Sequence, residues 1–185
     1  MKSSRMAEKL SATLAALALT AGLGLAGAPP ASAAYCGITW GSTEKVVPTH
    51  SSALIVDVRS GRHECFDRLV IDTRGAVAGY RVAYTKHVTQ PGSGFTVPLR
   101  GGARLAVTVL APAYDDGRAT YAPPDRGELV DVRGYSTFRQ VALAGSFEGQ
   151  TTFGLGVRGR LPMRVFVVPG PGAGSRVVVD VAHRW

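Results

Sequence analysis

Apolar residues recur at every second position in a series of short segments, and this alternation limits the fold more than any other feature of the chain. Leu54, Val56 and Val58, for example, alternate with Asp57 and Arg59. A period of two is typical of β-strands with one buried face. Further segments with this pattern, or with a short apolar run, span residues 69–71, 80–84, 105–109, 129–132, 138–143, 153–157, 163–168 and 176–181.

Glycine and proline punctuate these segments at short intervals. Ser60-Gly61 predicts a hairpin turn, residues 91–94 (Pro-Gly-Ser-Gly) a second turn, and residues 112–127 a long surface loop. After the N-terminal region, no segment keeps a helical period. Roughly ten short strands with frequent turns predict an all-β fold, either a β-sandwich or a partly closed barrel.

Two segments repeat a charged pattern. Residues 68–72 read Arg-Leu-Val-Ile-Asp and residues 176–180 read Arg-Val-Val-Val-Asp. In a strand, this spacing places the arginine, the central apolar residue and the aspartate on one face. A weaker similarity relates residues 69–82 to residues 155–165. Two similar β units packed together would explain both repeats, and chance matches in a chain rich in Val and Arg are the alternative.

The N-terminus has the order of a secretory signal peptide. Lys2, Arg5 and Lys9 precede an apolar stretch over residues 10–28, and residues 31–33 (Ala-Ser-Ala) form a small-residue cleavage site. A membrane anchor is the competing interpretation. We predict a signal peptide over residues 1–33 and a single β domain over residues 34–185. Later apolar runs fall short of the ~20 residues of a helical span, so we expect a secreted protein that does not span the membrane.

The net charge of this domain limits the kinds of partner that we expect it to bind. Without the signal peptide the chain keeps 18 basic against 12 acidic residues, a formal net charge of +6. Such a surface favours anionic wall polymers or membrane headgroups, and a merely soluble basic surface is the alternative. Export, and the lack of aromatic residues interleaved with basic ones, argue against nucleic-acid binding.

Cys36 and Cys65 are the two cysteines of the chain. In an oxidising compartment we expect them to form a disulfide. A reactive or metal-binding pair is the alternative, but the spacing is not that of a C-x-x-C motif.

No pattern in the chain predicts a catalytic site, a metal site or a cofactor. Ser146 lacks the flanking glycines of a G-x-S-x-G nucleophile motif, and we expect a turn there. The histidines have no metal-ligand spacing. Carboxylates for glycoside cleavage could come from any of four predicted loop residues, and the sequence favours no pair among them. These residues are Asp115, Asp125, Glu128 and Glu148.

The best candidate for a ligand site lies in the segment from Tyr135 to Arg164. It combines polar side chains around a turn with two glycines that leave one strand face bare. A strip without side chains lets a ligand or another chain approach the backbone, although the glycines could equally accommodate sheet coiling. The candidate residues are Arg139, Gln140, Glu148, Gln150, Thr151, Gly154 and Gly156.

The same region resembles a known family. Residues 135–158 (YSTFRQVALAGSFEGQTTFGLGVR), followed by 161–166 (LPMRVF) and 177–182 (VVVDVA), are similar to the AMIN-like domain proteins of actinobacteria. Residues 36–42 (CGITWGS) and 63–72 (HECFDRLVID) resemble them too. The resemblance implies a β-sandwich related to the AMIN domains of cell-wall amidases and secretins, which bind peptidoglycan.

Three functions follow as hypotheses. The first is an exported, non-catalytic module that binds peptidoglycan or another wall polymer. The second is an exported interaction factor for an envelope enzyme, which could pair through an exposed sheet edge. The third is an unrecognised wall hydrolase. We expect no amidase or secretin domain in the chain, so wall binding rests on analogy with the family.

Overall fold

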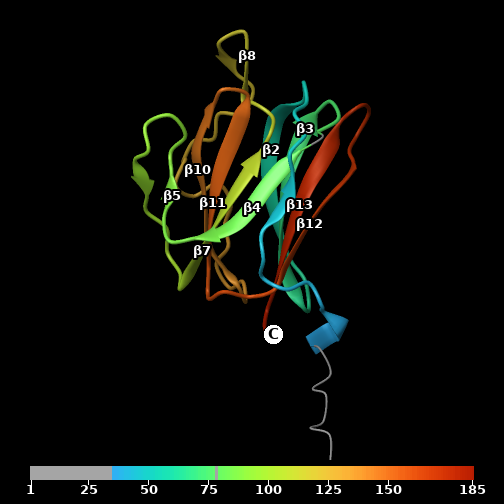
Figure 1. Ribbon diagram of the computed structural model, residues 1–185, viewed down its shortest axis with the longest axis vertical. Coiled ribbons are helices and arrows are strands. Elements are labelled where there is room, and N and C mark those ends of the chain that lie inside the picture. Colours follow the sequence, from blue (N-terminus) through green and yellow to red (C-terminus); the bar gives the residue numbers. More distant parts are fainter. Residues whose placement is uncertain (1–34, 78) are drawn as a thin grey trace, which may run out of the picture. The chain divides into compact units, whose positions relative to one another are not determined.

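Antiparallel strands make up nearly all the regular structure of this protein (Figure 1). The computed structural model describes residues 35–77 and 79–185, and within them the one helical element is a three-residue 3₁₀ turn, η1 (Tyr35–Gly37). The predicted signal peptide, residues 1–33, lies outside the described residues.

The strands form two main sheets whose inner faces share one core. The five-stranded sheet has the order β1 (Lys45–Val47), β4 (Tyr80–Thr85), β7 (Ala103–Val109), β11 (Gln150–Val157) and β10 (Phe138–Phe147). The four-stranded sheet has the order β12 (Met163–Pro169), β13 (Ser175–Ala182), β3 (Phe66–Arg74) and β2 (Leu54–Arg62). Two small hairpins complete the structure: β5 (Val88–Thr89) with β6 (Thr96–Val97), and β8 (Tyr114–Asp115) with β9 (Arg118–Ala119). Two sheets packed face to face confirm the predicted all-β sandwich. Neither main sheet closes on itself, so the alternative of a partly closed barrel does not apply.

The core is built from the alternating apolar residues that the sequence shows. In β3 and β13, every second side chain is fully buried between the sheets, and β7 and β11 supply the opposing layer. Burial of branched aliphatic side chains from both sheets is what holds such sandwiches together. Fully buried side chains of this core include Leu69, Ile71, Val179, Val107, Phe153 and Leu155.

Two predicted local elements are wrong. Ser60-Gly61 is not a turn: β2 continues to Arg62, Gly61 pairs with Arg68, and the Ser60 hydroxyl contacts the Tyr135 hydroxyl at 3.1 Å. Residues 129–132 are not a strand either. Leu129 N donates to Val141 O at 2.8 Å along the edge of β10, but no continuous ladder follows.

The charged repeat has a simple structural meaning. Its two copies are β3 and β13, which are neighbouring antiparallel strands of the four-stranded sheet. Arg68 lies opposite Asp180, and Asp72 lies opposite Arg176. Both copies point their charged residues to the outer face, as the alternation predicts. The repeat therefore builds complementary charge pairs within one sheet.

Candidate functional site

The β10–β11 hairpin carries all the residues predicted to bind a ligand, but they do not converge on one site. Gln140 pairs with Gly156 near one end of the hairpin. Gln150 pairs with Phe147 at the other end, beside the turn. The register thus places Arg139, Gln140, Gly154 and Gly156 along one part of the hairpin, and Glu148, Gln150 and Thr151 around its tip.

The glycine strip is covered by the chain itself. A Cβ atom on Gly156 would lie 2.0 Å from the Arg100 carbonyl oxygen, and one on Gly154 would lie 2.7 Å from Leu99 Cδ1. Leu99 packs with Val88 on small residues of the sheet's outer face. The close approach that the glycines permit is therefore made by residues 99–100, and this face is not open to a ligand.

Two of the predicted polar side chains are buried and bonded within the protein. The Gln140 amide accepts from Arg100 N at 2.8 Å and donates to Gly127 O at 2.9 Å. The Thr151 hydroxyl donates to Ala111 O at 2.8 Å. Because buried polar groups need such partners, these contacts account for the two side chains as connections between loops and the sheet.

Glu148 and Gly149 form the two-residue turn between β10 and β11. Both have positive φ, 48° and 77°, as in the turns that suit the twist of a hairpin. The prediction of a turn near Ser146 is confirmed, with the Ser146 hydroxyl contacting the Thr151 hydroxyl at 2.9 Å. Glu148 itself is exposed.

Arg139 borders a hollow of about 710 Å³. Its guanidinium donates to the carbonyl oxygens of Tyr135, Ser136 and Phe138 at 2.8–3.3 Å, which fixes the loop before β10. The hollow has apolar walls and charges of both signs at its margin. Its lining residues are Arg100, Glu128, Val130, Asp131, Val132, Arg133, Gly134, Tyr135, Phe138 and Arg139.

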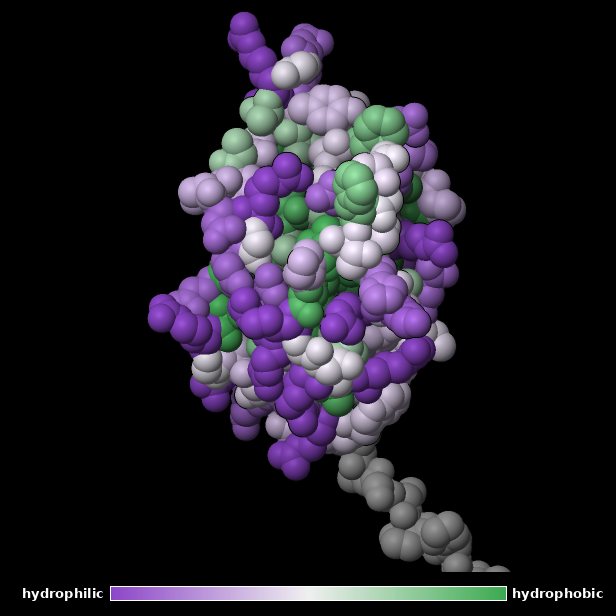
Figure 2. Space-filling view, turned by 90° about the vertical axis from the view of Figure 1, so that its left-hand side faces the viewer, coloured by the Kyte–Doolittle hydropathy of each residue, from purple (hydrophilic) through white to green (hydrophobic). Residues whose placement is uncertain are grey.

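Two of the three arginines beside this hollow are paired with carboxylates. Arg100 pairs with Glu128, and Arg133 pairs with Asp131 at 2.6 Å. The hydrogen bonds from Arg133 lower the pKa of Asp131 to about 2. Seen from the side of β5 and β10, the molecule is mainly hydrophilic, with apolar residues recessed between polar ones (Figure 2). Arg139 is the third arginine of the lining and binds carbonyl oxygens instead of a carboxylate, so the hollow keeps an excess of one positive charge.

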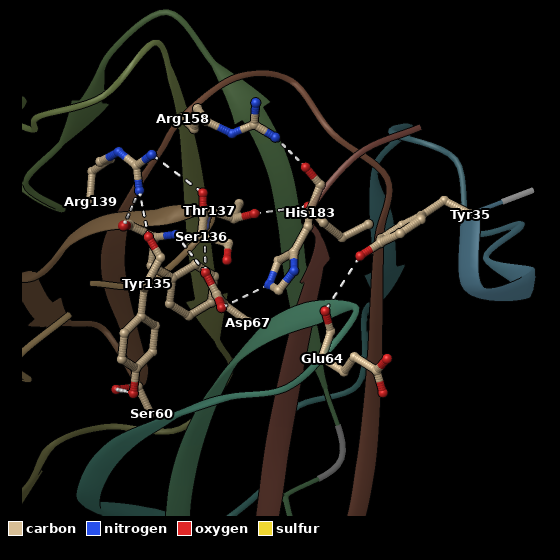
Figure 3. Close-up of polar contacts among 12 residues, drawn as sticks. Tyr35, Ser60, Glu64, Asp67, Tyr135, Ser136, Thr137, Arg139, Arg158 and His183 are labelled. Carbon is tan, nitrogen blue, oxygen red and sulfur yellow. Dashed lines mark hydrogen bonds and ion pairs between the residues drawn. The ribbon is translucent and has the colours of Figure 1, made fainter. Parts of the chain in front are cut away.

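A buried aspartate joins the two sheets next to Arg139 (Figure 3). Asp67, at the start of β3, is fully buried and accepts from Thr137 N at 2.6 Å and Phe138 N at 2.9 Å. Its other oxygen lies 3.0 Å from His183 Nε2. These contacts fasten β10 to the four-stranded sheet and the C-terminal segment, so they account for an Asp–His pair that sequence analysis did not find.

The outer face of the four-stranded sheet offers a different surface, which we call the arginine face. Four arginines from four strands share two aspartates there. Asp180 binds Arg68 and Arg164 at 2.7 and 2.8 Å. Asp72 binds Arg59 and Arg176 at 2.7 and 3.1 Å. Asp57 on β2 lies opposite Asp72 and adds a third carboxylate beside Arg59. Since four arginines face three carboxylates, the arginine face has an excess of one positive charge.

Aromatic rings lie at one end of the arginine face. The Arg164 guanidinium carbon lies 4.4 Å from the ring centroid of Trp40, 5.1 Å from that of Phe166 and 5.5 Å from that of Phe66. Trp40 packs edge-on against Phe66, with ring centroids 5.6 Å apart. Stacking of this kind orders an arginine while its charge stays near solvent. The result is a surface that combines flat rings with cations.

Sequence analysis found part of this surface. The repeat identified Arg68, Asp72, Arg176 and Asp180 as residues of common faces, but it did not indicate that the two strands pair. Arg59 and Arg164 had no such signal, because they come from β2 and β12, the two edge strands of this sheet, which do not carry the repeat.

Other kinds of site can be assessed only over the part of the chain that the structure covers. Within residues 35–77 and 79–185, no three His, Cys, Asp or Glu residues group in a way that could hold a metal ion. No helix within these ranges has the length and apolar character needed to cross a membrane.

Comparison with protein families identifies the class of domain. A family model described as the AMIN-like domain matches residues 53–183, well over half of the chain. The chain therefore belongs to the AMIN-like family, and this membership suggests a binding module associated with the cell wall. Comparison with curated proteins and with solved structures gives no significant match.

Proposed function

We propose that this protein is an exported, non-catalytic module that binds peptidoglycan or another polymer of the bacterial cell wall. The observation that carries the proposal is the arginine face with its ordered Arg164 between aromatic rings. Aromatic rings stack on the apolar faces of sugars, and guanidinium groups bind carboxylates and phosphates through paired hydrogen bonds. Wall polymers present both kinds of group.

Three further features support this function. The chain belongs to the AMIN-like family. The net charge of +6 that the chain keeps without the predicted signal peptide favours association with anionic polymers. The disulfide between Cys36 and Cys65 suits an oxidising compartment outside the cytoplasm.

Co-sedimentation with purified peptidoglycan, with and without its teichoic acids, tests the proposal. We expect retention at 0.15 M salt, where the Debye length is about 8 Å and weak long-range attraction is screened. Trp40→Ala should reduce retention, because it removes the ring against which Arg164 stacks. Trp185→Ala is the matched control, since Trp185 is 65% exposed and lies outside the arginine face. Absence of retention on both wall preparations would refute the function.

An interaction factor for an envelope enzyme is the second candidate. β12 is an edge strand of the four-stranded sheet, and Val167 on it is 38% exposed. An extended segment of a partner could add to such an edge. Val167→Lys should then abolish binding to a purified envelope enzyme while wall retention stays unchanged, and unchanged enzyme binding would exclude this edge.

A further inference from the structure

A hollow of about 290 Å³ lies in the middle of the arginine face. We call it the Gly61 hollow, because the glycine at this position in β2 has no side chain to fill the space between the arginines. Among residues 35–77 and 79–185, three arginines and one histidine border it, and no carboxylate does. Its lining residues are Arg59, Ser60, Gly61, His63, Arg68, Val70, Val168, Arg176 and Val178.

Asp72 and Asp180, which hold the arginines in place, are not among the residues that line this hollow. Asp180 is fully buried, and its hydrogen bond raises the pKa of Arg68. Asp72 is 16% exposed and is shared by Arg59 and Arg176. The cations are therefore fixed by groups beneath the surface, and they need no large rearrangement to receive an anion.

Hydrogen-bond donors remain for a ligand. A guanidinium carries five N–H donors. Among the described residues, Arg176 uses only Nε, which donates to Asp72 at 3.1 Å. Arg59 donates to the same carboxylate through Nε and Nη2, at 2.7 and 3.2 Å. The remaining Nη donors of both arginines can bind a further anionic oxygen.

Phosphate suits this arrangement better than a planar carboxylate. Its oxygens point in tetrahedral directions, so donors from separate strands can each bind one of them. The floor of the hollow is apolar, since Val70 and Val178 are 6% and 3% exposed, and it can contact a carbon chain. We infer that the Gly61 hollow binds the phosphate groups of an anionic phosphodiester polymer of the wall. This inference rests on the proposed wall binding and specifies the recognised group.

Titration of the protein, purified as its host cell produces it, tests the inference with two probes: inorganic phosphate and poly(glycerol phosphate). Gly61→Val fills the hollow without a change of charge. A Cβ atom there meets just one group within 4 Å, His63 Nε2 at 3.6 Å, so the strand accommodates it. Arg59→Gln removes one cation and leaves Arg176 on Asp72. Arg118→Gln, an exposed residue of the β8–β9 hairpin, is the control for loss of one charge.

We expect both Gly61→Val and Arg59→Gln to weaken poly(glycerol phosphate) binding about tenfold at 0.15 M salt, and Arg118→Gln to change it less than about twofold. Equal binding by Gly61→Val and the wild type, or equal effects of Arg59→Gln and Arg118→Gln, would overturn the inference. Binding of inorganic phosphate without binding of poly(glycerol phosphate) would also overturn it, because the hollow would then not recognise the polymer.

The same variants separate this inference from the proposed function. If bare peptidoglycan retains every variant and each variant binds poly(glycerol phosphate) as strongly as the wild type, the proposed wall binding is supported. The Gly61 hollow is then not a phosphate site. If the wild type binds no wall preparation but does bind poly(glycerol phosphate) through the hollow, the wall function fails and the phosphate site stands.

Discussion

Asp180 and Arg68 lie opposite each other on β13 and β3, and two hydrogen bonds of 2.7 and 2.9 Å join them. The carboxylate is fully buried and also binds Arg164. Removal of one member of such a cluster leaves partly buried cations without a counter-charge. We predict that Asp180→Ala lowers the free energy of unfolding by about 3 kcal/mol in urea denaturation.

Asp115→Ala is the control for this prediction. Asp115 is 57% exposed, and its pair with Arg74 spans 3.5 Å. Exposed pairs of this kind contribute about 0–1 kcal/mol. Equal destabilisation by the two substitutions would show that the arginine–aspartate pairs of the arginine face do not stabilise the sheet.

Gly156 and Gly154 differ in what covers them, and alanine substitutions should differ accordingly. Gly156→Ala places a methyl group against the Arg100 carbonyl oxygen, and the backbone of the covering segment must move. Gly154→Ala meets the end of the flexible Leu99 side chain. We predict a loss of about 3 kcal/mol or more for the former and about 1 kcal/mol for the latter. Thermal unfolding measures both, and equal losses would contradict the assigned covering.

The strands of the sandwich were predictable because one face of each is buried. The failures came where burial alone does not decide. Ser60-Gly61 has the composition of a turn, but pairing with β3 carries the strand past it. Leu129 and Val130 have the composition of a strand, but they contact the core from a loop beside β10.

The candidate site was harder to predict for a physical reason. Gly154 and Gly156 correctly indicated a close backbone approach, but sequence does not say whether the approaching group belongs to a ligand or to the chain. The arginine face needs the register of four strands, and only β3 and β13 carry a repeat that shows up in sequence. Its ligand therefore stays a prediction.

Ionisation of Tyr121 makes the stability of the protein depend on pH under alkaline conditions. Burial, with a smaller contribution from the charge of Asp57, raises the pKa of Tyr121 from 10.0 to about 12. Below pH 10 both the folded and the unfolded chain keep this phenol protonated, so it adds no pH dependence. Between pH 10 and about 12 only the unfolded chain ionises, so stability falls as pH rises. Melting temperatures from pH 9 to 11.5 should fall less steeply in Tyr121→Phe than in the wild type.

Burial raises the pKa values of Tyr80 and Tyr84 as well, so these residues add to the alkaline loss in both proteins. The informative quantity is therefore the difference between wild type and Tyr121→Phe. Melting temperatures that fall equally with pH in the two proteins would contradict the assigned burial of Tyr121.

The Cys36–Cys65 disulfide connects stability to the arginine face. The bond confirms the predicted pairing, and its sequence separation of 29 corresponds to roughly 3.6 kcal/mol of chain-entropy stabilisation. It ties the segment that contains Trp40 to the start of β3, where Phe66 lies. We predict that joint Cys36→Ser and Cys65→Ser substitution lowers the unfolding free energy by about this amount. At a temperature where the variant is folded, wall retention should fall to that of Trp40→Ala, since Trp40 loses its covalent tether. Retention equal to the wild type would mean that noncovalent contacts, such as edge packing on Phe66 and the 2.7 Å hydrogen bond from Met163 N to Gly41 O, hold Trp40 over Arg164 without the disulfide.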